Sequence, residues 1–263
     1  MDETPHVLLT NDDGIDDLGL EVLYEHLSEA VDVTVVAPAE DQSGVGRRNS
    51  YYAGLRDHEW GYVVEGMPAD CVAFGLRGLD ERPDLVVSGA NPGPNIALHR
   101  LGRSGTVGAA VEAAHLGIPA IAVSTYDPVG GEVDDPTPES FARSAEFTTA
   151  LCERLPDSGA FDAVDYLNVH VPTERAESPA VRITRPNEAF DVTVSRDGDA
   201  VSFEDRSYDP LREDLDVDFP DDEGETDRLA LSDGDVSVSP LGVRDQVTES
   251  DALADALDGL ELA

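Results

Sequence analysis

Two neighbouring carboxylates stand where an apolar run ends near the start of the chain. In the stretch VLLTNDDGIDDLG (7–19), Asn11, Asp12, Asp13 and Gly14 directly follow the apolar residues. Asn, Asp and Gly are the commonest turn residues, so a simple turn explains this segment on its own. Adjacent carboxylates repel each other, however, and a divalent cation would convert that repulsion into shared attraction. A turn and a metal site are therefore both open at this point.

Further polar side chains follow other apolar runs of the chain. Ser43 comes after the run at 31–38, and Asn91 and Asn95 come after the run at 83–89. Because ligands bind beyond the carboxyl ends of parallel strands, we expect these residues to meet at one edge of a sheet. Carboxylate, hydroxyl and amide oxygens are hard ligands that suit Mg²⁺ or Mn²⁺.

The motif SGT, Ser104–Thr106, stands where a helix over 107–117 is expected to start. A helix start exposes backbone N–H groups at the positive end of the helix dipole, which makes a natural phosphate site. Ser and Thr are also ordinary N-caps, and no P-loop motif occurs in the chain. A cation beside a phosphate site indicates a metal-dependent phosphohydrolase or a nucleotide-binding α/β protein, with a metal-activated water as the attacking group.

The elements that must position these residues alternate between strands and helices. Continuous apolar runs predict strands at 6–10, 31–38, 83–89, 118–125 and 165–172, with a small hairpin at 51–65. Helical spacing predicts helices at 18–30, 67–79, 107–117 and 138–155. This pattern predicts an α/β fold, a Rossmann-like three-layer α/β/α arrangement with a mostly parallel sheet.

The character of the chain changes after Pro172. Residues 181–209 alternate as in β structure around an RDGD turn, residues 227–241 read as a strand pair, and 248–263 as a short acidic helix. Asp214, Asp216 and Asp218 resemble a calcium loop, but Phe219 stands where such a loop needs glycine, so a solvated acidic loop is favoured. We predict a catalytic domain over 1–172 and a β-rich extension, an oligomerisation arm with a C-terminal helix, over 173–263.

The charge of the chain is extreme. It has 56 acidic and 17 basic residues, a formal net charge of −39, and every basic residue is arginine. A folded protein with an acidic surface, suited to a very salty cytoplasm, fits this composition, and binding to a nucleic-acid polymer does not. No apolar run is long enough for a membrane span. Cys71 and Cys152 are expected to be reduced core residues, and the N-terminus does not read as a signal peptide, so we expect a cytoplasmic protein.

Several motifs in order resemble the SurE family, the stationary-phase survival nucleotidases. They are LLTNDDGIDDLGL (8–20), VVAPAEDQSG (35–44), GMPADCV (66–72), PDLVVSGANPGPN (83–95) and SGTVGAAVEAAHLGIPAIAVS (104–124). The resemblance implies a divalent-metal-dependent phosphatase that converts nucleoside 5′-monophosphates, and as a further candidate 3′-monophosphates, to nucleoside and phosphate. It also implies a homodimer or homotetramer formed through the extension.

The resemblance also implies roles for single residues. One cation per subunit, Mg²⁺ or Mn²⁺, would be held by Asp12, Asp13, Ser43 and Asn91. The phosphate would be bound by Asn11, Asn95, Ser104, Gly105 and Thr106. The catalytic residues would be Asp12, Asp13, Asn95 and Ser104.

The chain departs from the family pattern between Asn95 and SGT. Many members have an acidic residue there, whereas this chain has IALHRLGR (96–103), with His99, Arg100 and Arg103. Arg103 could neutralise a phosphate or be a surface or interface charge. His170 stands where the family often has Asn, and a core role is favoured for it. Two other functions stay open, an exopolyphosphatase acting on short polyphosphate and a nucleotide-binding protein without turnover.

Overall fold

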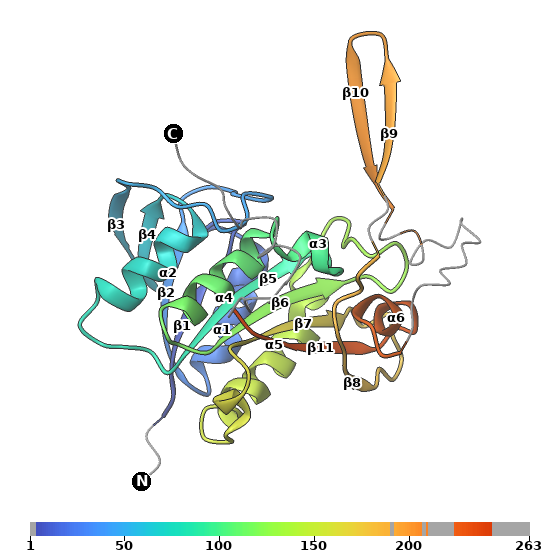
Figure 1. Cartoon of the computed structure of the whole chain (residues 1–263). Coiled ribbons are helices and arrows are strands. Elements are labelled where there is room, and N and C mark those ends of the chain that lie inside the picture. The colour runs from blue at the N-terminus through green and yellow to red at the C-terminus, as the bar shows by residue number, and fades with distance from the viewer. Residues whose placement is uncertain (1–3, 190–191, 207–208, 210–223, 244–263) are drawn as a thin grey trace, which may run out of the picture.

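A nine-stranded sheet forms the centre of the structure, a computed structural model that describes residues 4–189, 192–206, 209 and 224–243. Its strand order is β3-β4-β2-β1-β5-β6-β7-β11-β8 (Figure 1). The strands are β1 (His6–Thr10), β2 (Asp32–Pro38), β3 (Gly54–His58), β4 (Gly61–Glu65), β5 (Leu85–Pro92), β6 (Ala120–Tyr126), β7 (Tyr166–Pro172), β8 (Val181–Ile183) and β11 (Val236–Leu241). All neighbours from β4 to β7 pair in parallel, whereas β3 and β11 run antiparallel to β4 and β7.

Helices cover both faces of this sheet. The helices are α1 (Leu18–Ser28), α2 (Pro68–Arg77), α3 (Leu98–Leu101), α4 (Gly105–His115), α5 (Pro138–Arg154) and α6 (Asp227–Ser232). Apolar residues of α1 and α5 form one core with Val7 and Leu9, and those of α2 and α4 form a second core with Leu8. Neighbouring strand residues point to opposite faces, so Val7 and Leu9 make one side of the sheet apolar and Leu8 the other. The predicted three-layer α/β/α arrangement is thus confirmed.

Local sequence signals explain where the helices next to the site begin. The Asp17 side chain caps α1 by accepting a hydrogen bond from the Leu20 backbone N–H at 3.0 Å. Helix α4 buries Ala109, Ala110 and Ala113 completely. These small side chains let α4 lie close to β5 and β6, which brings its N-terminus to the carboxyl edge of the sheet.

The part of the chain after Pro172 is rich in β structure, as predicted. Strands β11 and β8 extend the central sheet beyond β7. Strands β9 (Val192–Asp197) and β10 (Ala200–Asp205) form a separate hairpin that projects from the body of the molecule (Figure 1). The domain boundary at 172/173 stays a prediction.

The strand pair predicted over 227–241 is wrong in its first half, because α6 occupies that half. Leu229 and Leu231 alternate with small or polar residues, which mimics a strand. Thr226 decides the outcome: its hydroxyl accepts a hydrogen bond from the Leu229 backbone N–H at 3.2 Å and caps a helix.

Two of the sequence predictions fall on undescribed parts of the chain. Asp214, Asp216 and Asp218 and the helix predicted over 248–263 lie outside the described residues. Among the described residues, no helix has the length and apolar character that crossing a membrane requires.

Candidate functional site

A cavity of about 400 Å³ lies at the carboxyl edge of the parallel strands. Five of the predicted site residues line it, namely Asp12, Ser43, Asn91, Asn95 and Ser104. They come from the segments after β1 and β2, from the end of β5 and the loop after it, and from the N-cap of α4. The structure therefore brings these distant segments together at the sheet edge where the topology predicted a ligand site.

Asn11 forms a turn rather than a wall of the cavity. Its side-chain Nδ2 donates to the Gly14 carbonyl at 2.8 Å, and its Oδ1 accepts from the Gly14 N–H at 3.2 Å. The side chain is fully buried. The turn interpretation of this segment is thus correct for Asn11, and this turn presents the two aspartates at the end of β1.

Asp12 is held in place by the start of α4. The Thr106 hydroxyl donates to Asp12 Oδ1 at 2.7 Å. A Cβ at Gly105 would lie 2.6 Å from Asp12 Cβ, so a larger residue there would push the carboxylate away. Burial raises the pKa of the Asp12 carboxyl above its ordinary value, and the hydrogen bonds from Thr106 oppose that rise. Gly105 and Thr106 thus shape the aspartate site directly.

Asp13 has the most exceptional environment of the site. Its Oδ2 atom is buried and has no hydrogen-bond partner among the described residues. Burial, followed by the charges of Asp12, Asp17 and Asp41, raises the pKa of Asp13 to about 8. A buried carboxylate oxygen without a donor is costly unless a cation satisfies it. The donor chemistry at this point therefore fits a hard divalent cation.

Ser43 and Asn91 supply the other predicted ligand oxygens. The Ser43 hydroxyl donates to Asp41 Oδ1 at 2.6 Å, which keeps its lone pairs available as acceptors. The Asn91 Nδ2 group donates to the Gly93 carbonyl, so the opposite end of its amide is an oxygen acceptor. Within the described part of the chain, no group of three or more His, Cys, Asp or Glu gathers as a metal cluster. Any cation here would thus be held by two carboxylates together with neutral oxygens.

Asn95 and Ser104 complete the predicted set. The Asn95 Nδ2 group donates to Ser124 Oγ at 3.1 Å and to Thr106 Oγ1 at 3.4 Å. Ser104 is the N-cap of α4, where its hydroxyl accepts from the Val107 N–H at 3.1 Å. Asn95 is thus connected to Asp12 through Thr106, and Ser104 fixes the first turn of the helix that faces the cavity.

The cavity wall also holds three charged residues, of which the sequence left the roles of the two arginines open and did not indicate the acid. They are Arg100, Arg103 and Glu132. Burial raises the pKa of Glu132, and the positive charge of Arg100 opposes that rise. Arg100 Nη1 also pairs with Asp205 Oδ2 at 3.0 Å. Glu132 lies in a loop after β6 that carries no motif, so only its place at the sheet edge could have indicated it.

His170 is a buried core residue, as favoured, but it contacts the site. Burial lowers its pKa to about 3, so the ring is neutral near pH 7. Its Nε2 atom accepts a hydrogen bond from the Asn95 backbone N–H at 3.1 Å. His170 therefore supports a site residue without reaching the cavity itself.

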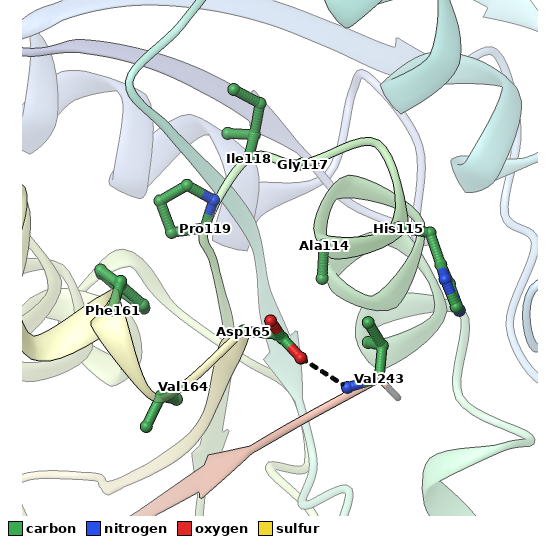
Figure 2. A pocket seen from close by; sticks show the side chains of 9 residues that line it. All are labelled: Ala114, His115, Gly117, Ile118, Pro119, Phe161, Val164, Asp165 and Val243. Atoms are coloured by element: carbon green, nitrogen blue, oxygen red, sulfur yellow. Dashed lines mark hydrogen bonds between the residues drawn. The ribbon is translucent and has the colours of Figure 1, made fainter. Parts of the chain in front are cut away.

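A larger cavity, of about 760 Å³, lies at the opposite edge of the sheet (Figure 2). Most of its lining side chains are apolar, among them Ile118, Phe161 and Val164, and the short helix η1 (Ala160–Asp162) borders it. Its Asp165 carboxylate accepts a hydrogen bond from the Val243 N–H at 2.8 Å. Among the described residues that line this cavity, Asp165 is the one carboxylate and none belongs to the first turn of an α-helix, so the smaller cavity is the better candidate for chemistry.

Similar proteins are known from sequence. A protein of Natronomonas pharaonis called 5′-nucleotidase SurE is 48% identical over 94% of this chain and 96% of its own length. A protein of the same name from Haloarcula marismortui is 47% identical over 92% of this chain and 89% of its own length. Both organisms are halophilic archaea.

The structure is similar as well. The crystal structure of the SurE protein from Aquifex aeolicus has a TM-score of 0.75 and 30% identity, and the match covers 96% of this chain and 98% of that chain. Residues 7–191 match the sequence model of the family described as survival protein SurE. That match spans most of the chain and includes every predicted site residue, so the chain belongs to the SurE family.

Proposed function

We propose that the protein is a divalent-metal-dependent 5′-nucleotidase that hydrolyses nucleoside 5′-monophosphates to nucleoside and phosphate. One observation carries the proposal. The buried, unpartnered oxygen belongs to Asp13, the neighbour of Asp12. Asp12 itself lines a cavity whose other walls present neutral oxygens, two arginines and Glu132. The relatives named 5′-nucleotidase SurE support the same substrate class.

Each group of residues has a distinct task in this proposal. Asp12, Asp13, Ser43 and Asn91 would hold one Mg²⁺ or Mn²⁺ ion, which when bound polarises a phosphoryl oxygen and lowers the pKa of a water. The N-terminus of α4, capped by Ser104, orients the phosphate, since helix N-termini favour anions.

The cavity wall supplies further electrostatic help. Arg100 and Arg103 bring positive charge to a site that otherwise repels phosphate, because the protein as a whole is strongly acidic. Asn95 keeps Thr106, and through it Asp12, in place. Together these residues would stabilise the charge that develops on the phosphoryl group in the transition state.

A panel of phosphate esters tests the activity and its specificity. We expect phosphate release from AMP in molar KCl with Mn²⁺ or Mg²⁺, and loss of release when EDTA is in excess. 3′-AMP and tripolyphosphate are the comparison substrates, because the two cavity arginines could also bind a second phosphate. Faster turnover of tripolyphosphate than of every nucleotide would instead favour an exopolyphosphatase, and binding of AMP without phosphate release would favour a non-catalytic nucleotide-binding protein.

We also propose that the protein is a homodimer or homotetramer in which the β9–β10 hairpin contacts a second copy. Val194 and Phe203 are direct cross-strand partners, and Val201 lies on the same face of the hairpin. These side chains are 58%, 74% and 50% exposed. Apolar side chains gathered on one face of a projecting hairpin are typical of a protein interface.

Replacing Val194 and Phe203 together by Ser should lower the molecular mass in solution to that of one 28.0 kDa chain. Light scattering in molar KCl measures this, because salt screens the charge repulsion between two acidic copies. Thr193→Ala with Ser202→Ala, on the opposite face of the same hairpin, is the matched control and should keep the parental mass. A parent protein that is already a single 28.0 kDa species would contradict the proposal.

We infer a cytoplasmic location from the thiols. Cys71 and Cys152 are both free and buried. Burial raises the pKa of Cys152 to about 12 and also raises that of Cys71, so both remain thiols that suit a reducing compartment.

A further inference from the structure

A strained backbone position lies two residues after Asn95, which is part of the cavity wall. Ala97 has a φ of 68°, a region that residues with a Cβ rarely occupy. Its side chain is fully buried. Such a conformation persists only where the surroundings hold it. The contacts of residues 95–98 therefore show what keeps Asn95 in place.

Strand β7 holds the first residue of this segment. His170 Nε2 accepts a hydrogen bond from the Asn95 N–H at 3.1 Å, and Asn168 Nδ2 donates to the Asn95 carbonyl at 3.0 Å. Both polar groups of the Asn95 backbone are thus bound by side chains of one buried strand. Its side chain remains aimed at Thr106 and Ser124.

Helix α6 holds the strained residue itself. Asp227 Oδ2 accepts a hydrogen bond from the Ala97 N–H at 2.8 Å. Asp227 Oδ1 accepts from the Asn187 N–H at 2.8 Å, and the Asn187 carbonyl accepts from the Leu98 N–H at 2.7 Å. Asp227 is fully buried, so these bonds are shielded from water. Two consecutive N–H groups of the segment are thereby tied to the region after Pro172.

We propose that Asp227, together with His170, is a positioning residue for catalysis. The two side chains hold residues 95–97 in the strained conformation that aims Asn95 at Thr106, whose hydroxyl binds Asp12. This inference rests on the nucleotidase function proposed above. It gives the region after Pro172 a part in the chemistry of each subunit, separate from assembly.

Asp227→Asn is the central test. The amide has nearly the same shape, but its NH₂ group cannot accept a hydrogen bond, so at least one of the three backbone hydrogen bonds that the Asp227 carboxylate accepts is lost. We expect kcat for AMP to fall about 10- to 100-fold, because small misplacements of catalytic groups and lost supporting contacts cause losses of this size. The rate is expressed per bound Mn²⁺ and measured well below the melting temperature. The KM for AMP and the stoichiometry of Mn²⁺ binding should stay close to the parental values. Asp233→Asn, which removes a largely exposed carboxylate at the other end of α6, is the matched control and should be indistinguishable from the parent.

A second substitution separates positioning from general destabilisation. Glycine adopts a φ of 68° without strain, so Ala97→Gly should reduce the need for the Asp227 contact. The double variant Asp227→Asn with Ala97→Gly is expected to recover most of the lost kcat. Because glycine also changes the free energy of unfolding, thermal melts accompany the rates, and kcat is compared well below the melting temperature of every variant, where a loss caused only by weaker folding does not appear.

Hydrogen exchange measures the contact independently of activity. The Ala97 and Leu98 amides should exchange faster in Asp227→Asn than in the parent, while amides in the β1–β5–β6 centre of the sheet remain protected. Hydrogen exchange also separates a failure of the proposed function from a failure of this inference. A parent that releases no phosphate from any nucleotide contradicts the proposed function, whereas the exchange rates still test the contact.

Two results would overturn the inference. One is a folded Asp227→Asn variant with parental kcat, and the other is unchanged exchange at Ala97 and Leu98. If Asp227→Asn does not fold, His170→Leu answers the same question. Leucine has a volume similar to that of histidine and suits the apolar surroundings of the strand, but it leaves the Asn95 N–H without its acceptor. Parental kcat in that variant would equally reject the inference, and a loss of about 10- to 100-fold would support it.

Discussion

Asp12→Asn and Asp13→Asn are each expected to lower phosphate release from AMP by about 10³-fold or more. Each change removes one negative charge from the proposed metal site and keeps nearly the same shape. Asp12→Asn retains one side-chain oxygen that can accept from the Thr106 hydroxyl, so the change affects the proposed metal ligand, and Asp13→Asn places an amide where no described donor satisfies the buried carboxylate oxygen. Initial rates with saturating Mn²⁺ measure the effect.

Thermal melts of the same variants test whether the loss comes from the metal. Mn²⁺ should raise the melting temperature of the parent, because it binds the folded state, and the rise should nearly vanish in both variants. In EDTA, at a pH above the Asp13 pKa of about 8, neither variant should be less stable than the parent, since like-charge repulsion between the two neighbouring carboxylates is relieved. Asp16→Asn, an exposed acid in the same segment, is the matched control and should keep both activity and metal response. Parental activity in Asp12→Asn and Asp13→Asn would leave the turn as the whole explanation of the segment.

The native fold is expected to disappear at low salt. With a net charge of −39, the chain repels itself strongly. The Debye length is about 10 Å at 0.1 M salt and about 3 Å at 1 M, so molar salt removes most of this repulsion. Circular dichroism over a KCl series should show a full native signal above about 1 M and loss of helix and sheet signal near 50 mM, where the screening length is longer than at 0.1 M.

A second cosolute tests whether salt acts by screening charge or by being excluded from the protein surface. Sucrose stabilises folded proteins by exclusion but screens no charge. It should therefore restore little of the native signal at 50 mM salt. An unchanged melting temperature in 50 mM KCl would show that the acidic surface does not control folding.

The fold was predictable because its physical causes are local. Continuous apolar runs marked the parallel strands, and helical spacing marked α1, α2, α4 and α5. The rule that ligands bind at the carboxyl edge of such strands then placed Asp12, Ser43 and Asn91 around one cavity. No knowledge of side-chain contacts was needed for that step.

The supporting contacts could not be predicted, because they depend on residues far apart in the chain. Asp227 binds the Ala97 N–H across 130 positions, and the residues of its helix alternate as those of a strand do. Glu132 reaches the cavity from a loop without a motif. Asn11 and Ser104 have the right residue types for a ligand site, yet their side chains also satisfy backbone groups of a turn and of a helix.

Anomalous diffraction from crystals grown with Mn²⁺ shows whether the two aspartates hold a metal ion. We expect one strong manganese peak per subunit within direct bonding distance of Asp12, Asp13, Ser43 and Asn91, with no such peak in Asp13→Asn crystals grown in the same way. A manganese peak elsewhere, or no peak at the two aspartates in crystals of an active enzyme, would contradict this expectation.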